Sequence, residues 1–294
     1  MTGGVPRAPY DRTVTTGIMG RSSGFTSGER FTPLDRARRV WEYRRILLLL
    51  VSRDLKVRYA GSALGYVWTV LDPLLMSAVY WFLFTQVIDR HVGRPPYILF
   101  LVSGQLAFHW ITGSINSSVG ALRSEAQMVR SSNVPRELWV LRVVLSKGAE
   151  YVFSLPVLAM FAVAYWKAPT KEIFLLPLAF LLTIIFCMGI GLILAPAAVL
   201  LKDLRSIVRI LVRALFFLSP VLYSIRDVDK KRPGAAEIIG WNPITGIMTL
   251  FRSCFYPEEL EWRFVAHSAI VSLIILGIGV WVFQRLERPM LKEI

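Results

Sequence analysis

Six apolar stretches separated by charged segments account for most of this 294-residue chain beyond residue 64. Most of them reach the ~20 residues that a helix needs to cross the hydrocarbon core of a bilayer. A soluble core does not explain such a pattern. We therefore predict an all-α integral membrane protein with six transmembrane helices, at residues 65–88, 97–122, 138–166, 173–201, 207–225 and 264–284.

Basic residues are distributed unevenly between the two sides of these helices. If the N-terminus is cytoplasmic, 24 of the 34 Lys and Arg residues fall on the inner side. The positive-inside rule then predicts that both termini are cytoplasmic. The net charge of +14 is spread over every inner segment. It therefore favours attraction to anionic lipids over binding of nucleic acid, which requires one basic surface.

The chain before the first apolar stretch has two parts. Residues 1–33 are rich in Gly, Ser, Thr, Pro and Arg, and we predict a disordered cytoplasmic tail. Residues 34–62 are predicted to form an amphipathic helix in the inner membrane interface, because its apolar run ends at Arg53, too early for a span. One face of this helix holds Trp41, Leu48, Val51 and Leu55, and the other holds Arg38, Glu42, Arg45, Ser52 and Lys56. The predicted six-span membrane domain then covers residues 63–294.

Four segments in a fixed order resemble the type-2 permeases of ATP-binding-cassette (ABC) exporters. They are RDLKVRYAGSALGYVWTVLDPL (residues 53–74), MVRSSNVPRELWVLR (128–142), LKDLRSIVRILVRALFFLSPVLYS (201–224) and WNPITGIMTLFR (241–252). The resemblance covers about residues 40–285 and depends on order and spacing, since each motif alone is a soft pattern. Within the family, the chain resembles the polysaccharide and O-antigen exporters. Among these it is similar to the actinobacterial permeases that export lipid-linked galactan for the cell wall.

The resemblance implies a complex of two permeases and two nucleotide-binding ATPase subunits in the bacterial inner (plasma) membrane. Its substrate would be a polysaccharide linked to a polyprenyl pyrophosphate carrier. The sequence contains no Gly-x-x-x-x-Gly-Lys-Ser/Thr loop to hold nucleotide phosphates. We therefore expect a transport permease and not an enzyme, with ATP and Mg²⁺ bound by the partner subunit and no metal site in this chain.

The longest inner loop between spans is the expected contact with the ATPase subunit. This expectation comes chiefly from the family resemblance, and an ordinary polar connector is the alternative. The residues assigned to coupling are Arg130, Ser132, Asn133, Pro135 and Arg136.

The second apolar stretch carries a stripe of polar residues spaced four, three and four apart: Gln105, His109, Thr112 and Asn116. This spacing predicts that they share one face of a helix. Two interpretations stay open. The face could line a hydrated translocation path that exchanges hydrogen bonds with sugar hydroxyls, or it could form hydrogen bonds between helices.

Asp72 lies about eight residues into the first stretch, and Met76, Tyr80 and Phe84 continue its helical face. A carboxylate at such a depth is costly, so Asp72 could face the translocation path, pair with a basic residue of another span or be protonated. We assign its helical face to the translocation path. For Tyr80 and Phe84, a place in the aromatic belt of the outer interface remains the alternative.

A basic ridge leads into the fifth stretch. Lys202 precedes three arginines spaced four residues apart, and the deeper ones must reach the interface, an acidic partner or a phosphate. Candidates for binding the carrier pyrophosphate are Arg205, Arg209 and Arg213, with anionic phospholipid as the alternative. In the third stretch, Lys147 and Glu150 are three residues apart and are expected to neutralise each other.

The last outer loop, residues 226–263, is long and apolar at 241–256, where Asn242, Pro243 and Gly246 interrupt it. We predict short re-entrant helices there. Cys187 and Cys254 lie at different depths, so no disulfide is expected.

The rival functions are a membrane-embedded enzyme of polyprenyl-phosphate metabolism and a passive channel. An enzyme would need acidic residues or acid–His pairs clustered at one depth. The sequence suggests instead that Asp72 and Glu150 are isolated and that His91, His109 and His267 are scattered.

Overall fold

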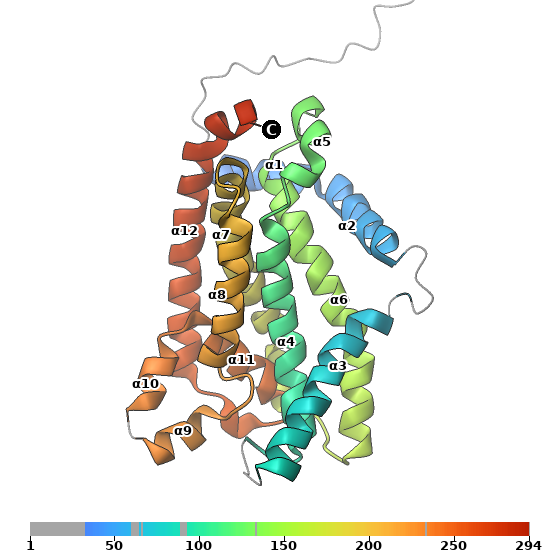
Figure 1. Ribbon diagram of the computed structural model, residues 1–294, viewed down its shortest axis with the longest axis vertical. Helices are drawn as coiled ribbons and strands as arrows, with labels where there is room; N and C mark the ends of the chain where they lie inside the picture. The colour runs from blue at the N-terminus through green and yellow to red at the C-terminus, as the bar shows by residue number, and fades with distance from the viewer. Residues whose placement is uncertain are drawn as a thin grey trace, which may run out of the picture.

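The computed structural model describes residues 33–59, 65, 67–88, 93–132, 134–232 and 234–293, and no strand occurs among them. The predicted tail, apart from Pro33, and the small-residue turn at residues 60–62 lie outside the described residues. The helices run mostly along one direction, with the C-terminus at one end of the bundle (Figure 1). The all-α class is confirmed.

Five helical segments of the described chain are long and apolar enough to cross a membrane. They are α3 with the π-helical η1 (Val67–Phe82, Leu83–Val87), α4 (Tyr97–Ser118), α6 (Glu137–Ala164), η3 with α7 (Lys171–Leu175, Leu176–Leu200) and α12 (Trp262–Glu293).

The predicted fifth span is shorter than the sequence suggests. α8 covers only Leu204–Leu218, 15 residues or about 22 Å at 1.5 Å per residue, so it does not reach the usual spanning length. Its end has a local cause. Ser219 precedes Pro220 and has an extended backbone (φ −100°, ψ 148°), as residues before proline prefer. Pro220 thus ends the helix before the end of the predicted span.

α4 and α7 form the interior of the bundle. α4 packs against α3, α6, α7, α8 and α11, and α7 packs most extensively against α12. The α7–α12 contact depends on glycine, because a Cβ on Gly279 would collide with the backbone oxygen of Gly189. Small residues allow two transmembrane helices to approach closely in this way.

The predicted interfacial helix consists of two helices, α1 (Pro33–Glu42) and α2 (Arg44–Tyr59). α2 lies beside α6 (Figure 1). Its buried contact differs from the predicted apolar face. Leu47 and Val51 pack on Leu138 of α6, whereas Trp41 and Leu48 are 70% and 61% exposed. α2 is apolar on both sides because one side meets the protein and the other is left for lipid.

The outer loop forms the predicted short helices: α9 (Ile225–Lys231), α10 (Ala235–Gly240), α11 (Pro243–Ser253) and η4 (Pro257–Glu259). α11 starts at Asn242, whose side chain accepts a hydrogen bond of 3.0 Å from Ile244 N. It is buried along its length against α4, α7 and α12, which confirms a re-entrant helix (Figure 1).

Arg252, at the end of α11, is fully buried over the ring of Phe100, 3.8 Å from its centroid. It donates hydrogen bonds to the backbone carbonyls of Pro220, Val221 and Tyr223, which follow α8. The re-entrant helix therefore satisfies buried backbone carbonyls of the irregular segment that follows α8.

Nearby, Arg94 pairs with Glu259 (Nε–Oε1 2.7 Å) and with Asp227 (3.7 Å), and Ser224 Oγ donates to the same Glu259 oxygen at 2.7 Å. These contacts join the segment before α4 to α9 and η4.

The α7–α12 contact makes a direct prediction. Gly279→Ala should destabilise the protein by about 1–3 kcal/mol, the usual cost of overpacking. Gly277→Ala is the matched control on the same helix, since a Cβ there meets nothing within 4 Å. That variant should be neutral or gain up to ~1 kcal/mol from helix propensity. Thermal unfolding in detergent measures both, and equal midpoints would contradict the proposed packing.

Candidate functional site

α4 is buried on nearly all sides except one, and that side is polar. Buried side chains on this helix include Leu106, Phe108 and Trp110. Beyond Tyr97, Asn116 is exposed on this helix, and its partly exposed residues are Gln105, His109, Thr112, Gly113 and Ser117. The sequence prediction that Gln105, His109, Thr112 and Asn116 share a face is thus confirmed; we call these four residues the polar face.

The polar face is not used for hydrogen bonds between helices of the described chain. Thr112 Oγ1 donates within α4, to Phe108 O at 2.9 Å. Gln105, His109 and Asn116 make no hydrogen bond to another described residue. Hydrogen bonds between helices among the described residues therefore do not explain these polar side chains.

α3 and α8 flank the polar face. Tyr80 of α3 stacks on Phe216 of α8 with ring centroids 5.5 Å apart, and Phe216 contacts Phe108 of α4 at 5.4 Å. Phe84 packs edge-on against Tyr97 at 6.3 Å. These aromatic residues hold the three helices together.

The other two α3 residues assigned to the path, Asp72 and Met76, are exposed. The structure therefore divides the four predicted α3 residues into two packing aromatics and two exposed side chains.

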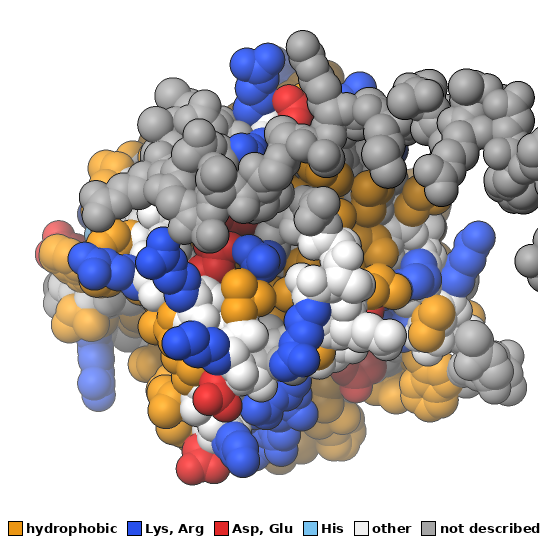
Figure 2. All heavy atoms as spheres, turned by 90° about the horizontal axis from the view of Figure 1, so that it is seen from above, with side chains coloured by type: hydrophobic (Ala, Val, Ile, Leu, Met, Phe, Trp, Pro, Cys, Tyr) orange, Lys and Arg blue, Asp and Glu red, His pale blue; other side chains and the backbone are white. Residues whose placement is uncertain are grey.

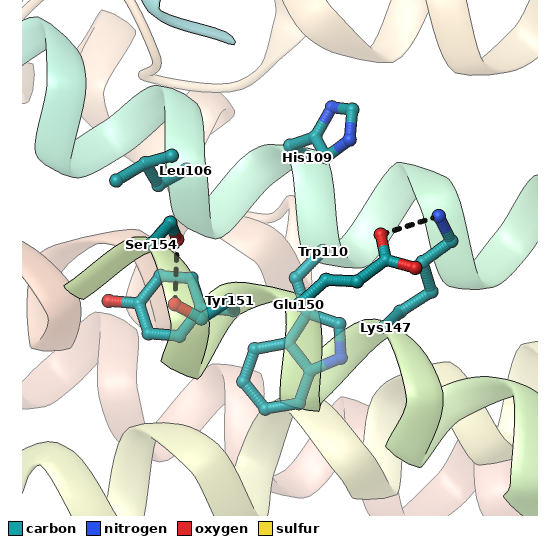
Figure 3. A pocket seen from close by; sticks show the side chains of 7 residues that line it. All are labelled: Leu106, His109, Trp110, Lys147, Glu150, Tyr151 and Ser154. Carbon is teal, nitrogen blue, oxygen red and sulfur yellow. Dashed lines mark hydrogen bonds and ion pairs between the residues drawn. The ribbon is translucent and has the colours of Figure 1, made fainter. Parts of the chain in front are cut away.

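Charged residues from α2 and α6 meet beside the polar face. Lys147 Nζ lies 2.8 Å from Glu150 Oε2, as predicted, and Arg58 Nη1 lies 2.6 Å from Glu150 Oε1. The aliphatic part of Lys147 crosses α4 at Gly113, where a Cβ would be 3.1 Å from Lys147 Cδ. Figure 3 shows the Lys147–Glu150 pair below His109. We call Arg58, Lys147 and Glu150 the charged triad.

The sequence-based conclusion that Asp72 and Glu150 are isolated from histidine was wrong. His109 lies within electrostatic range of Asp72, Lys147, Glu150 and Arg58. The error arose because these residues belong to four helices, and only tertiary packing brings them to one depth.

A small cavity opens between α4 and α6 at this point (Figure 3). Its volume of about 10 Å³ is room for one water molecule and excludes a sugar ring. It is lined by Leu106, His109, Trp110, Lys147, Glu150, Tyr151 and Ser154. This cavity is therefore too small to hold a glycan substrate.

A second group of ion pairs lies toward the other end of α2. Arg142 of α6 contacts Asp54 Oδ2 at 3.0 Å and Glu125 Oε1 at 2.9 Å, and Arg53 also pairs with Glu125. Burial raises the pKa of the Glu125 carboxyl, but hydrogen bonds and charges from Arg142 and Arg53 outweigh burial and hold the pKa below its ordinary value of 4.5.

Glu125 ends η2 (Arg123–Glu125) and directly precedes the short helix α5 (Ala126–Ser131). Near the C-terminal end of α5, Arg130 is exposed and Ser132 Oγ donates to Met128 O at 2.6 Å. The predicted coupling residue Asn133 lies outside the described residues.

Pro135 is half-buried, and Arg136 pairs with Glu287 of α12 at 2.5 Å. Arg136 therefore joins the loop to α12, a contact that the sequence does not reveal. α5 lies at the end of the bundle that carries the C-terminus (Figure 1), and Lys and Arg side chains are prominent over this end (Figure 2).

The basic ridge on α8 is accessible. Arg205, Arg209 and Arg213 are all exposed, and no described carboxylate pairs with them. Arg205 lies beside α4, since a Cβ at Gly120 would be 3.5 Å from its Nη2. The ridge therefore begins where the polar face ends.

The chain is similar to a known protein family and to several known proteins. Residues 45–256 match the ABC-2 type transporter family. The O-antigen export system permease protein RfbA of Myxococcus xanthus is 30% identical over 84% of this chain and 94% of its own length. A Klebsiella pneumoniae protein of the same name is 27% identical, covering 82% and 92%. The polysialic acid transport protein KpsM of Escherichia coli is 24% identical, covering 83% and 94%.

The ion pairs of Glu125 predict a pH-dependent stability. Because its folded-state pKa is lowered, the ionised carboxylate stabilises the fold above pH 4.5, and this contribution is lost as the pH falls through the folded-state pKa. Glu125→Gln should therefore cost about 1–3 kcal/mol near neutral pH, since it weakens the contacts of a buried arginine.

The measurement is thermal unfolding of wild type and Glu125→Gln in detergent, near neutral pH and below pH 4.5. The difference between the two proteins should shrink in acid. The matched control is Glu42→Gln, which removes an exposed ion pair with Arg38 and should have little effect at either pH. A difference that is the same at both pH values would contradict the assignment.

Proposed function

The chain belongs to the ABC-2 type transporter family, and we propose that it is the membrane-spanning subunit of an ATP-driven exporter of polyprenyl-pyrophosphate-linked polysaccharide. It is a multi-pass permease of a polysaccharide or O-antigen export system, from a family of inner-membrane transporters. The substrate we propose is a galactan or an O-antigen-like glycan used in cell-wall biogenesis.

The uncovered polar face is the single observation that carries this proposal. From Gln105 to Asn116 it extends over about 17 Å at 1.5 Å per residue, more than half of a hydrocarbon core of ~30 Å. Hydrocarbon offers no hydrogen bonds, so a polar strip of this length facing lipid would be strongly unfavourable. We propose that a second copy of the chain covers it and that the two polar faces enclose a hydrated passage.

Within this passage, the amides of Gln105 and Asn116 and the hydroxyl of Thr112 can exchange hydrogen bonds with sugar hydroxyls. His109, next to the charged triad, adds a further polar group at mid-depth. On α3, exposed Asp72 and Met76 extend the lining, and Tyr80 and Phe84 shape it by packing. Many weak, interchangeable contacts suit a polymer that must slide and not stay bound.

We propose that ATP and Mg²⁺ are bound by a separate nucleotide-binding subunit, so that two permeases assemble with two ATPases. α5 and its loop form the contact, with Arg130 and Ser132 at the surface and Pro135 and Arg136 fixing the loop. The prominence of Lys and Arg at this end supports a cytoplasmic location for it and for both termini (Figure 2).

Thiol labelling tests whether water reaches the polar face. In a variant without Cys187 and Cys254, which are both buried, single cysteines at Gln105, His109, Thr112 and Asn116 should react with a hydrophilic thiol reagent in the assembled transporter. Water in the passage makes these positions accessible. Labelling is measured by mass shift in membranes that contain the complex.

Two controls separate water from lipid. Ser114→Cys lies on the buried side of the same helix and should not react, and Leu273→Cys, 56% exposed on α12, should be shielded from the reagent by hydrocarbon. Polar-face cysteines that react no faster than these two controls would contradict the passage.

The second prediction concerns Arg209 and Arg213. If the ridge holds the carrier pyrophosphate, replacing both by Lys should reduce polymer export, because Lys keeps the charge but loses the planar fork that binds phosphate oxygens in pairs. We expect a loss of about tenfold, equal to the ~1.4 kcal/mol that separates such affinities. Export is normalised to membrane-inserted protein. Wild-type export by the double Lys variant would contradict pyrophosphate binding, and the ridge would then be assigned to anionic lipid.

A further inference from the structure

Ion pairs join α2 to two places: the loop that carries α5, and the charged triad beside the polar face. At one end, Arg53 pairs with Glu125, the residue before α5. At the other end, Arg58 pairs with Glu150 of the charged triad. The two ends are five residues apart, or about 7 Å along a helix.

Between these ends, Asp54 of α2 holds Arg142 of α6 at 3.0 Å and lies 3.3 Å from Ser146 Oγ. Arg142 in turn reaches back to Glu125. Glu125, Arg142, Asp54 and Ser146 are thus linked in series, and this series connects the loop that carries α5 with α6.

The two α6 residues that pair with α2 are buried, whereas the two arginines of α2 are partly exposed. The side chains of Arg142 and Glu150 are 6% and 4% exposed, against 34% for Arg53 and 38% for Arg58. A buried charge that loses its partner is strongly destabilised. Arg142 and Glu150 must therefore follow α2 when α2 moves, or else meet new partners.

The contacts of α2 also leave it free to shift. Its apolar contact with α6 centres on Leu47, Val51 and Leu138, and Leu50 also packs against the neighbouring cluster that contains Trp139. Arg142 Nε and Glu150 Oε1 meet their partners without hydrogen-bond geometry. Such pairs attract over a distance and tolerate small displacements, whereas a rigid packing contact would not.

The charged triad ends this path at the polar face. Glu150 holds Lys147, and Lys147 lies against Gly113 between His109 and Asn116. A displacement of Arg58 therefore changes the charge that faces the passage at mid-depth.

Resting on the function proposed above, we propose that α2 transmits the movement of α5 to Lys147 and Glu150, so that Arg58 is a positioning residue for transport. When the ATPase subunit moves α5, Glu125 draws Arg53 and with it the whole of α2. Arg58 then shifts relative to Glu150, and Lys147 follows at the polar face. A purely structural α2 would hold α6 in place and transmit nothing.

The test uses the complete complex of this chain with its ATPase subunit in lipid vesicles, and it measures ATP hydrolysis and glycan export in the same sample. Arg58→Gln should assemble and hydrolyse ATP as wild type does, while export per ATP falls about tenfold, within the range typical of coupling between two sites. Glu150→Gln should do the same. The double variant should be no worse than either single one, because both remove the same contact.

Arg38→Gln is the matched control, since Arg38 makes an exposed ion pair with Glu42 on α1 and should leave export per ATP unchanged. If Arg58→Gln fails to insert, Arg58→Lys replaces it and should show a smaller loss of the same kind. Unchanged export per ATP in the Arg58 variant, or equal loss of hydrolysis and export, would overturn transmission by α2.

A second measurement does not depend on export. Spin labels on α2 and α6, at Leu49→Cys and Val152→Cys, occupy exposed positions in the variant without native cysteines. Their separation should differ between nucleotide-free and ATP-bound complexes. A separation that ATP does not change overturns the proposal even if the complex exports glycan. A wild-type complex that exports no glycan, while the separation responds to ATP, would instead refute the proposed function.

Discussion

The cost of a polar group in hydrocarbon is the constraint on which this structure depends. α4 lies inside the bundle, yet its one uncovered side carries Gln105, His109, Thr112 and Asn116. Lipid cannot satisfy these groups, and among the four only Thr112 forms a hydrogen bond within the described chain. Water, a second protein copy or a passing sugar can. The proposed passage therefore rests on the same four residues whose packing within the described bundle leaves them partly exposed.

The buried charges follow the same constraint in a different way. Arg142, Lys147 and Glu150 lie within α6, where an unpaired charge would be very costly, and each has a partner of opposite sign. A buried ion pair contributes little net stability, but removing one partner is expensive. Such pairs consequently fix which helices stay together more than they strengthen the fold. Here they tie α2 to α6 and give α2 an influence on the interior that its few apolar contacts alone would not provide.

Features that depend on local periodicity could be predicted from the sequence, and features that depend on packing could not. The apolar stretches and the polar face follow from helix geometry, so both were predicted. The approach of Asp72 and Glu150 to His109 depends on three different helices, and Arg136 and Glu287 are 151 residues apart. The length of the fifth span was overestimated because apolar residues continue past Pro220, although α8 ends at Leu218. That proline was the available signal.

The two ends of the bundle are held by different chemistry, and this difference bears on which end can move. At the outer end, Arg252 binds the backbone carbonyls of Pro220, Val221 and Tyr223, which side-chain rearrangement cannot replace. At the end that carries α5, α2 is held mainly by ion pairs between side chains. Under the transmission proposed above, a movement of α5 therefore reaches the polar face along α2 and not along α8 and α11.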